Sequence, residues 1–356
     1  MRSRARRLRS RQDQNSGDQA MHDPHRAAPR RRDILALGAA ALAPFAAINA
    51  RAQDTFPVAG RPIRIVIPAP PGGPADILAR AIANHLAPLL DNVAIIVESR
   101  PGGASVPAAL AVARAPADGH TIMLGLNTTH TQVPHMFSKP PFDPFAEFTP
   151  ITQVYRSGSV LVAHPSVPVN DLKELVAWSK TQPDAVPAGS PSPGTNGHFY
   201  IEMLNQAGAR LNHIPYKGSA DAMRDLLGGF TKLQFDALVT SLPHIQSGKL
   251  KALAVTGTTR IKQLPNVATA REQGFPALDI TGWMGFFGPA NLPPATLDKL
   301  NKSIVAVLRK PELRAQFEPQ GVDFTGTTPG EFATLVRNDH EVWGRIIKQT
   351  GIKLDQ

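Results

Sequence analysis

Two patterns of apolar and polar residues alternate along most of the chain. Short, almost continuous apolar runs, such as residues 63–67 and 121–126, are typical of buried strands. Stretches with an apolar residue at every third or fourth position, such as residues 77–90, are typical of helices with one buried face. Because the two patterns follow each other in turn, the sequence predicts an α/β fold with mainly parallel sheets.

The remaining elements are expected in the same alternating order. Further strands are predicted at residues 93–98, 151–155, 160–163, 186–189, 213–216, 233–238, 250–255 and 280–289. Further helices are predicted at 104–114, from 172 onward after a cap at Asn170 and Asp171, and at 195–207, 220–227, 242–247, 294–309 and 329–350. A folded part of about 300 residues exceeds one comfortable core, so two domains are expected.

Residues 1–52 differ in composition from the rest of the chain. They contain eleven arginines and four aspartates, which together supply +7 of the formal charge of +10. A run of three arginines at 30–32 precedes an apolar stretch at 34–48, and Ala50-Arg51-Ala52 follows as a small-x-small cleavage site. This order predicts an export signal at residues 1–52, cleaved after Ala52. Because the positive charge is concentrated there, it does not indicate nucleic-acid binding.

Two export routes and two translation starts fit this leader. Residues 31–35 resemble a twin-arginine signal, but a general secretory signal with a basic start fits as well. Met1 and Met21 both fit the start of such a signal. The chain has no cysteine, so it cannot carry a disulfide or the lipid of a lipoprotein. We therefore expect an exported, soluble protein of the periplasm without a lipid anchor.

The loop between the first strand and the first helix is the strongest candidate for a binding site. Residues 68–76 are rich in proline and glycine and lead directly into a helix. The first amides of a helix are unpaired and lie at the positive end of its dipole, so such a loop can bind an anion. The loop has no lysine, which excludes a P-loop and makes a carboxylate the better ligand. The candidate contacts are Pro71, Gly72, Gly73, Pro74, Ala75 and Asp76.

Two further loops follow predicted strands. Ligands of α/β proteins bind at the carboxyl ends of strands, so both loops are candidate binding segments. The first is rich in glycine and small hydroxyl residues, although an ordinary capped helix start would look the same. Its candidate contacts are Ser190, Gly194, Thr195, Asn196 and His198. The second loop contributes Asn127 and Thr128.

Three single residues have two interpretations each. Lys217, followed by Gly218, comes after another strand and fits either a charge partner for a ligand acid or a solvated surface residue. Asp236 lies within an apolar run, and a buried carboxylate needs a partner. It therefore fits either a ligand contact or a support for the backbone at the cleft. Trp283 fits either the core or a cleft wall.

Signals for catalysis are poor. The sequence has no G-x-S-x-G or H-E-x-x-H motif, and no G-x-G-x-x-G motif follows a strand. No metal or cofactor is expected, and the chain is not expected to be an enzyme. Ser190 or Ser192 with His198 forms the one candidate set of nucleophile and base. A periplasmic hydrolase is therefore the less favoured alternative.

Taken in order, several segments resemble the Bug family, the periplasmic solute receptors of tripartite tricarboxylate transporters. The matching segments are 62–68, Pro70-Pro71-Gly72-Gly73 with Asp76, 98–103, 117–119, 148–151, 213–218, 242–245 and 248–256. The resemblance implies a two-domain periplasmic-binding-protein (Venus-flytrap) fold with a ligand cleft between lobes joined by crossing strands. In this fold we assign residues 53–155 and 279–356 to lobe 1 and residues 156–278 to lobe 2. It also implies that loops 70–76 and 190–198 grip a ligand carboxylate.

The resemblance further implies a function and partners. Such a receptor would close on a small dicarboxylate, tricarboxylate, acidic amino acid or aromatic acid. As a monomer, it would deliver this ligand to a membrane permease; a sensor with the same fold is the alternative. The chain departs from the family pattern at Pro191 and Pro193, each of which removes an amide donor from the second loop. It also has Ala237 where the family often has asparagine. These differences leave the ligand open.

Overall fold

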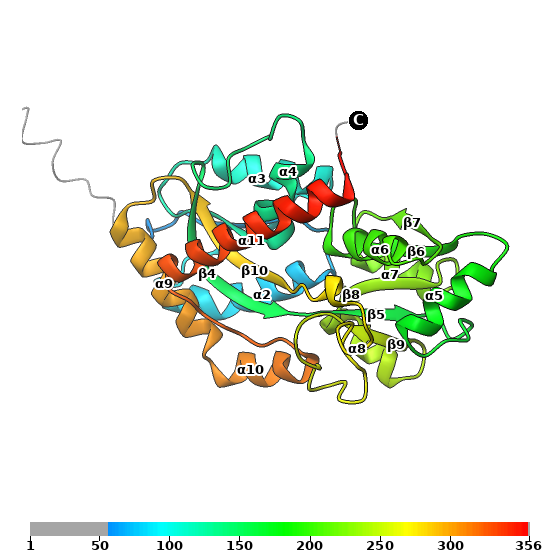
Figure 1. Cartoon of the computed structure of the whole chain (residues 1–356). Helices are drawn as coiled ribbons and strands as arrows, with labels where there is room; N and C mark the ends of the chain where they lie inside the picture. Colours follow the sequence, from blue (N-terminus) through cyan, green and yellow to red (C-terminus); the bar gives the residue numbers. More distant parts are fainter. Residues whose placement is uncertain (1–55, 355–356) are drawn as a thin grey trace, which may run out of the picture. The chain divides into compact units, whose positions relative to one another are not determined.

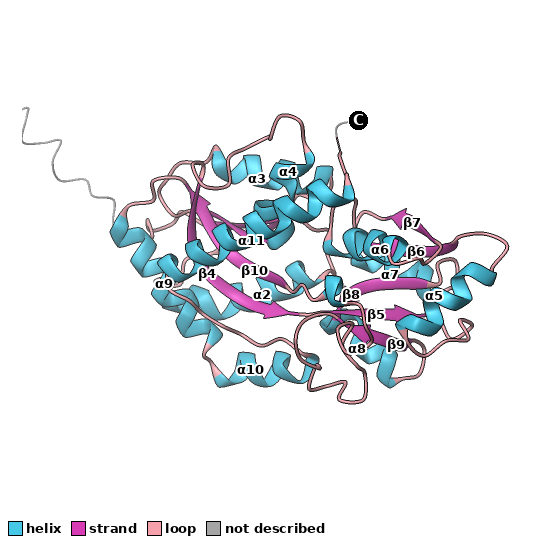
Figure 2. Ribbon diagram, viewed as in Figure 1, coloured by secondary structure: helices cyan, strands magenta, loops and turns pink. Residues whose placement is uncertain are grey.

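Two five-stranded sheets, each covered by helices on both faces, form the folded part of the chain (Figures 1 and 2). The computed structural model describes residues 56–354, so the predicted export signal lies outside the described residues. The first sheet has the order β2-β1-β3-β10-β4. Its strands are β1 (Ile63–Ile67), β2 (Ile95–Ser99), β3 (Thr121–Leu126), β4 (Phe148–Ser157) and β10 (Gly282–Pro289).

The second sheet has the order β7-β6-β8-β5-β9. Its strands are β5 (Ser159–Ala163), β6 (Val186–Ser190), β7 (Leu211–Pro215), β8 (Leu233–Ala237) and β9 (Lys251–Val255). We call the first sheet with its helices lobe 1 and the second sheet with its helices lobe 2. The assigned lobe limits near residues 155 and 279 remain a prediction.

The expectation of mainly parallel sheets is wrong for half of the strand pairs. Each sheet contains one reversed strand, β10 in lobe 1 and β5 in lobe 2, and each is antiparallel to both of its neighbours. The remaining pairs, β1 with β2 and β3, and β6 with β7 and β8, are parallel. The reversed strands are those by which the chain enters a sheet from the other lobe, and this crossing sets their direction.

The strands of lobe 1 alternate their side chains between two helix layers. Ile63, Ile65 and Ile67 of β1 belong to a core with α2 (Pro74–Leu86), α9 (Pro294–Leu308) and α10 (Pro311–Phe317). Val66 belongs to the core on the opposite face, with α3 (Val106–Ala113), α4 (Val133–Met136) and α11 (Pro329–Thr350). The apolar residues whose spacing predicted the long helices are therefore the residues that these helices bury against the sheet.

Lobe 2 repeats this arrangement. Leu161 and Phe235 pack with α5 (Leu172–Thr181) and α6 (Asn196–Gln206), whereas Val160 and Val162 pack with α7 (Ser219–Leu227) and α8 (Leu238–Gln246). Helix α8 begins four residues before its predicted start. Pro243 therefore lies in the interior of the helix, whereas the sequence pattern placed it in the first turn. Helix α10 and the short α4 were not predicted, because seven and four residues give too little periodicity.

The described residues, 56–354, belong to one compact unit, which contains both lobes. Within the described part of the chain, no helix is both long and apolar enough to span a bilayer.

Candidate functional site

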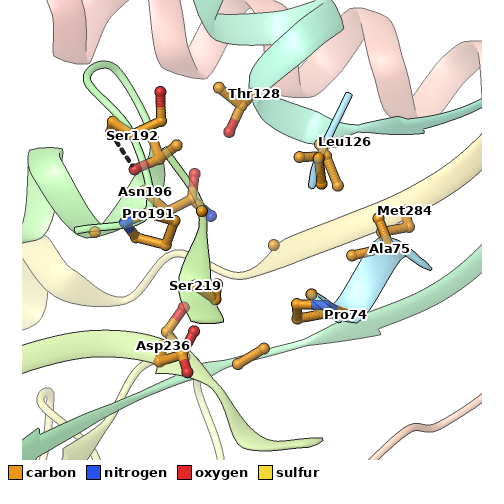
Figure 3. A pocket seen from close by; sticks show the side chains of 18 of the residues that line it. Pro74, Ala75, Leu126, Thr128, Pro191, Ser192, Asn196, Ser219, Asp236 and Met284 are labelled. Atoms are coloured by element: carbon orange, nitrogen blue, oxygen red, sulfur yellow. Dashed lines mark hydrogen bonds between the residues drawn. The ribbon is translucent and has the colours of Figure 1, made fainter. Parts of the chain in front are cut away.

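A cavity of about 180 Å³ lies between the two lobes and is lined by residues of both (Figure 3). Eleven of the residues proposed from the sequence line it: Gly73, Pro74, Ala75, Asn127, Thr128, Thr195, Asn196, Lys217, Gly218, Asp236 and Trp283. Six others are not among its lining residues: Pro71, Gly72, Asp76, Ser190, Gly194 and His198. The direct ligand contacts proposed for all seventeen stay predictions. What the structure supplies is a single cavity on which the three predicted loops converge.

Four helices begin at this cavity. They are α2, α6, α7 and α8, whose first residues Pro74, Asn196, Ser219 and Leu238 all line it. In none of the four does a side chain cap the first turn. Pro74 has no amide N–H, and Asp236 already accepts the Ala237 amide before α8. The other first amides, and the positive ends of the helix dipoles, are available to an anionic ligand.

The first loop is held in shape by a carboxylate that faces away from the cavity lining. Asp76 accepts hydrogen bonds from the Gly72 amide at 3.0 Å and from Arg80 Nε at 2.8 Å. Burial opposes the charge of Asp76, but the hydrogen bonds from Arg80 and Gly72 outweigh it and lower the pKa of this carboxyl. Gly72 itself has φ +81°, which suits glycine at this bend. Asp76 therefore supports the loop from behind.

The second loop lines the cavity with the predicted Thr195 and Asn196 and also with three residues that were not predicted as contacts. Pro191, Ser192 and Pro193 line the cavity, whereas Ser190 lies fully buried beneath them at the end of β6. The Ser190 hydroxyl lies 2.6 Å from His213 Nε2. The loss of amide donors at the two prolines therefore affects the cavity wall directly.

Two stacked imidazoles support this loop. The rings of His198 and His213 are 3.9 Å apart and almost parallel, and His198 Nδ1 accepts a hydrogen bond from the Gly194 amide at 3.0 Å. Burial lowers the pKa of both histidines to about 4, and the neighbouring His213 adds to the effect at His198. Both rings are therefore neutral near pH 7.

Charge is sparse around the cavity. Among the described residues that line it, Lys217 and Asp236 alone are charged types, and Lys217 is exposed. Asp236 is 3% exposed, and its Oδ2 accepts hydrogen bonds from Thr240 Oγ1 at 2.5 Å and Ser241 Oγ at 3.2 Å. Burial raises the pKa of the Asp236 carboxyl. Asp236 thus supports the start of α8, as one interpretation from the sequence held. It also lines the cavity, and its contact with a ligand stays a prediction.

Trp283 likewise serves both the core and the cleft. It is 2% exposed, packs edge-to-face on Phe332, and donates a hydrogen bond from Nε1 to Asp339. It also lines the cavity. Phe286, by contrast, is fully buried in the core of lobe 1.

The two lobes touch around the cavity. Asn196 Oδ1 accepts hydrogen bonds from Asn127 Nδ2 at 3.1 Å and from Gln132 Nε2, which both belong to lobe 1. Pro70 packs so closely on Gly218 that a Cβ added at Gly218 would lie 2.3 Å from Pro70 Cγ. These contacts join the two lobes at the edge of the cavity.

Sequence reasoning missed several lining residues. Tyr155, Ser157, Gly158 and Ser159 lie where β4 passes into β5, and Met284 lies on the returning strand β10. No local motif marks them, because they reach the cavity only through the crossing of the chain between lobes. Another missed group is Gly102, Ala104 and Ser105, at the start of α3. The Pro101-Gly102-Gly103 segment was a usable signal there, since it too links a strand to a helix.

Catalytic and metal chemistry find little support here. The base nearest to Ser190 is His213, not the predicted His198, and Ser190 does not line the cavity. Among residues 56–354, no group of three or more His, Cys, Asp or Glu side chains could hold a metal ion.

Comparison with known proteins gives the family. The family described as "Tripartite tricarboxylate transporter family receptor" matches residues 78–352, more than half of the chain. The chain belongs to this family. The resemblance to Bug proteins is thereby confirmed.

Relatives of this receptor match along most of their length. Protein BugT of Bordetella pertussis is 31% identical over 303 residues, which cover 85% of this chain and 92% of BugT. A protein from the tcbD-tcbE intergenic region of Pseudomonas sp. strain P51 is 30% identical over 329 residues, which cover 92% of this chain and 96% of that protein.

Solved structures of similar receptors share the two-lobed fold, which confirms the expected fold class. Periplasmic binding protein BugD has a TM-score of 0.78 at 32% identity, covering 83% of this chain and 99% of BugD. A Rhodopseudomonas palustris protein with bound malate, MatC, has a TM-score of 0.77 at 28% identity, covering 82% of this chain and all of MatC. An R. palustris protein solved with adipate has a TM-score of 0.78 at 28% identity, covering 83% and 99%.

Proposed function

We propose that this protein is a periplasmic receptor that captures a small carboxylate between its two lobes and delivers it to the permease of a tripartite tricarboxylate transporter. The observation that carries the proposal is the set of four uncapped helix starts around one small cavity between the lobes. Amides fixed in this way hold a carboxylate without a charged side chain. Each such charge-assisted hydrogen bond is worth about 1.5–3 kcal/mol.

Hinge closure would couple ligand binding to a change in the shape of the receptor. The ligand contacts both lobes only when they are closed, so it favours that form by its differential affinity. A shift of the closed population from 1:99 to 99:1 needs about 5.5 kcal/mol of such preference. Two or three of the hydrogen bonds above supply that amount. The permease could then distinguish loaded from empty receptor by shape.

The similar proteins support a small organic acid as the ligand. Two solved neighbours hold malate and adipate, and the family is that of transporter receptors. A hydrolase is less well supported. Ser190 is fully buried, and the lowered pKa of its partner His213 makes that ring a weak base. A sensor would share this fold and cavity, so capture of the permease or of a sensor protein by the tagged, loaded receptor separates these two roles.

The anion site can be tested at Ser192, which is partly exposed on the cavity wall. We expect Ser192→Asp to lower the affinity for carboxylates more than tenfold, since about 1.4 kcal/mol of repulsion at close range suffices. Ser192→Asn is the matched control, because it has the same shape without the charge. The measurement is the thermal shift of each protein with malate, adipate, glutamate and benzoate.

Two outcomes would contradict the proposed function. One is equal binding of acids by the Asp and Asn variants, which would place the anion elsewhere. The other is turnover of an ester substrate that disappears in Ser190→Ala, which would favour the hydrolase.

A further inference from the structure

The turn before α3 has a strained backbone. Ala104 has φ 50° and ψ 40°, and Ser105 has φ 71° and ψ −2°, so two successive residues other than glycine adopt left-handed conformations. Such conformations are uncommon outside glycine, asparagine and aspartate. They persist only where the surrounding structure holds them, and they cluster at ligand sites. Both residues line the cavity between the lobes.

Ser105 also has an unpaired hydroxyl. The residue is only 8% exposed, yet its side chain does not cap α3, although it occupies the position just before that helix. Within residues 56–354, no hydrogen-bond partner is found for this hydroxyl. Its oxygen is not enclosed by protein on all sides, so the hydroxyl is open to solvent or to a ligand. Because Ser105 lines the cavity, a bound ligand is the partner that the geometry offers.

Uncharged donors line the same cavity as Ser105. The strand order β2-β1-β3 places the Ser105 turn and Thr128 on opposite sides of the first ligand loop. Thr128 is 5% exposed, and in Figure 3 its side chain extends into the cavity. The first turn of α3 follows directly after Ser105 and offers free amides except at Pro107, which has none. Hydroxyl and amide donors together suit an oxygen acceptor.

The first ligand loop is tied to the same strand that leads into this turn. The Ser99 hydroxyl, at the end of β2, donates a hydrogen bond to the Ala69 carbonyl at 2.5 Å. A ligand carboxylate at the start of α2 would therefore lie beside a second, separately built group of donors.

We propose that Ser105 is a specificity-determining residue that donates a hydrogen bond to a second carboxylate of the ligand, apart from the carboxylate held at the starts of α2 and α6. This inference rests on the proposed function, because it concerns the other end of the same ligand. The left-handed backbone fixes the direction of the Ser105 side chain before the ligand binds. The site therefore favours a diacid over the monoacid of equal length.

The test compares matched acids on the full mature chain. Isothermal titration calorimetry with adipate against hexanoate, and with succinate against butyrate, measures the preference for a second carboxylate. We expect Ser105→Ala to weaken binding of the preferred diacid by about tenfold or more, the effect of losing one charge-assisted hydrogen bond. Binding of the monoacid should stay unchanged. Ser105→Gly also removes the hydroxyl, but it relieves the backbone strain and should show the same selective loss.

Ala104→Gly is the control, because it relieves strain in the same turn and keeps the hydroxyl; it should retain the preference of the original protein. Ser105→Ala could instead weaken the binding of diacid and monoacid equally, or change neither. Ser105 would then not bind a second carboxylate, and this inference would be wrong, whereas the proposed receptor function would be unaffected. A preference of the original protein for monoacids also contradicts it. If the original protein binds none of these acids, and none of malate, glutamate and benzoate either, both this inference and the proposed function are wrong.

Discussion

At the scale of single residues, two neutral histidines support the loop at residues 190–198. His198 accepts the Gly194 amide and stacks on His213, which contacts Ser190. A protonated His198 could not accept that hydrogen bond, and two charged rings 3.9 Å apart would repel each other. The loop therefore depends on the neutral form of the pair.

This dependence predicts an acid-sensitive stability. The pKa of each ring falls from an ordinary value of about 6.5 in the unfolded chain to about 4 in the folded protein. The unfolded state thus binds more protons between these values, and the folded state loses stability as the pH falls from about 6.5 towards 4. We expect His198→Gln to reduce the drop in melting temperature between pH 7 and pH 5.

His244→Gln, on α8, provides the control and should leave that drop unchanged. An unaltered drop in His198→Gln would show that the stacked pair does not carry the acid sensitivity.

The residue scale also shows what the sequence could and could not predict about the site. Gly73, Pro74 and Ala75 were found because a strand, a short loop and a helix start are local features of the sequence. Ser190 and His198 come from an equally clear motif, but they lie outside the cavity lining. Which way a side chain points at a strand end depends on packing against residues far along the chain, here His213.

At the scale of elements, the crossing between lobes depends on a tight contact. Strands β4 and β5 are separated by Gly158 alone. Ser159 and Thr256 exchange hydrogen bonds at 2.8 Å beside it, which ties one crossing segment to the chain that leaves β9. A Cβ added at Gly158 would lie 2.1 Å from the Thr256 carbonyl oxygen. The backbone of Thr256 thus occupies the space that a side chain at position 158 would need.

We therefore expect Gly158→Ala to destabilise the protein by about 1–3 kcal/mol, the usual cost of overpacking, and to weaken ligand binding by shifting one lobe against the other. Chemical denaturation and calorimetry measure the two effects. Gly330→Ala is the matched control, because nothing lies within 4 Å of the added Cβ at that helical position. Equal stability of the two variants would contradict the importance of this contact.

Most elements were predictable because their burial pattern is periodic. β1, β3 and α11 have the bounds that the sequence predicted. The reversed strands β5 and β10 were predicted as strands but not as antiparallel. Direction within a sheet depends on how the chain crosses between lobes, and apolar spacing carries no information about that.

At the scale of the whole folded unit, amides from two lobes share one cavity. The Asn196 side chain accepts hydrogen bonds from two side-chain amides of lobe 1, and Pro70 packs against Gly218. The starts of α2 and α6, one from each lobe, both line a cavity of about 180 Å³. The resemblance to a known family supplied this two-lobed arrangement, which local patterns in the sequence do not specify.

A crystal structure with the carboxylic acid that gives the largest thermal shift tests the central claim most directly. The account predicts one carboxylate of that acid between the lobes, within hydrogen-bond distance of first-turn amides of α2 and α6. A carboxylate bound outside this cavity, or held by a charged side chain with the first turns of both helices unoccupied, would contradict it.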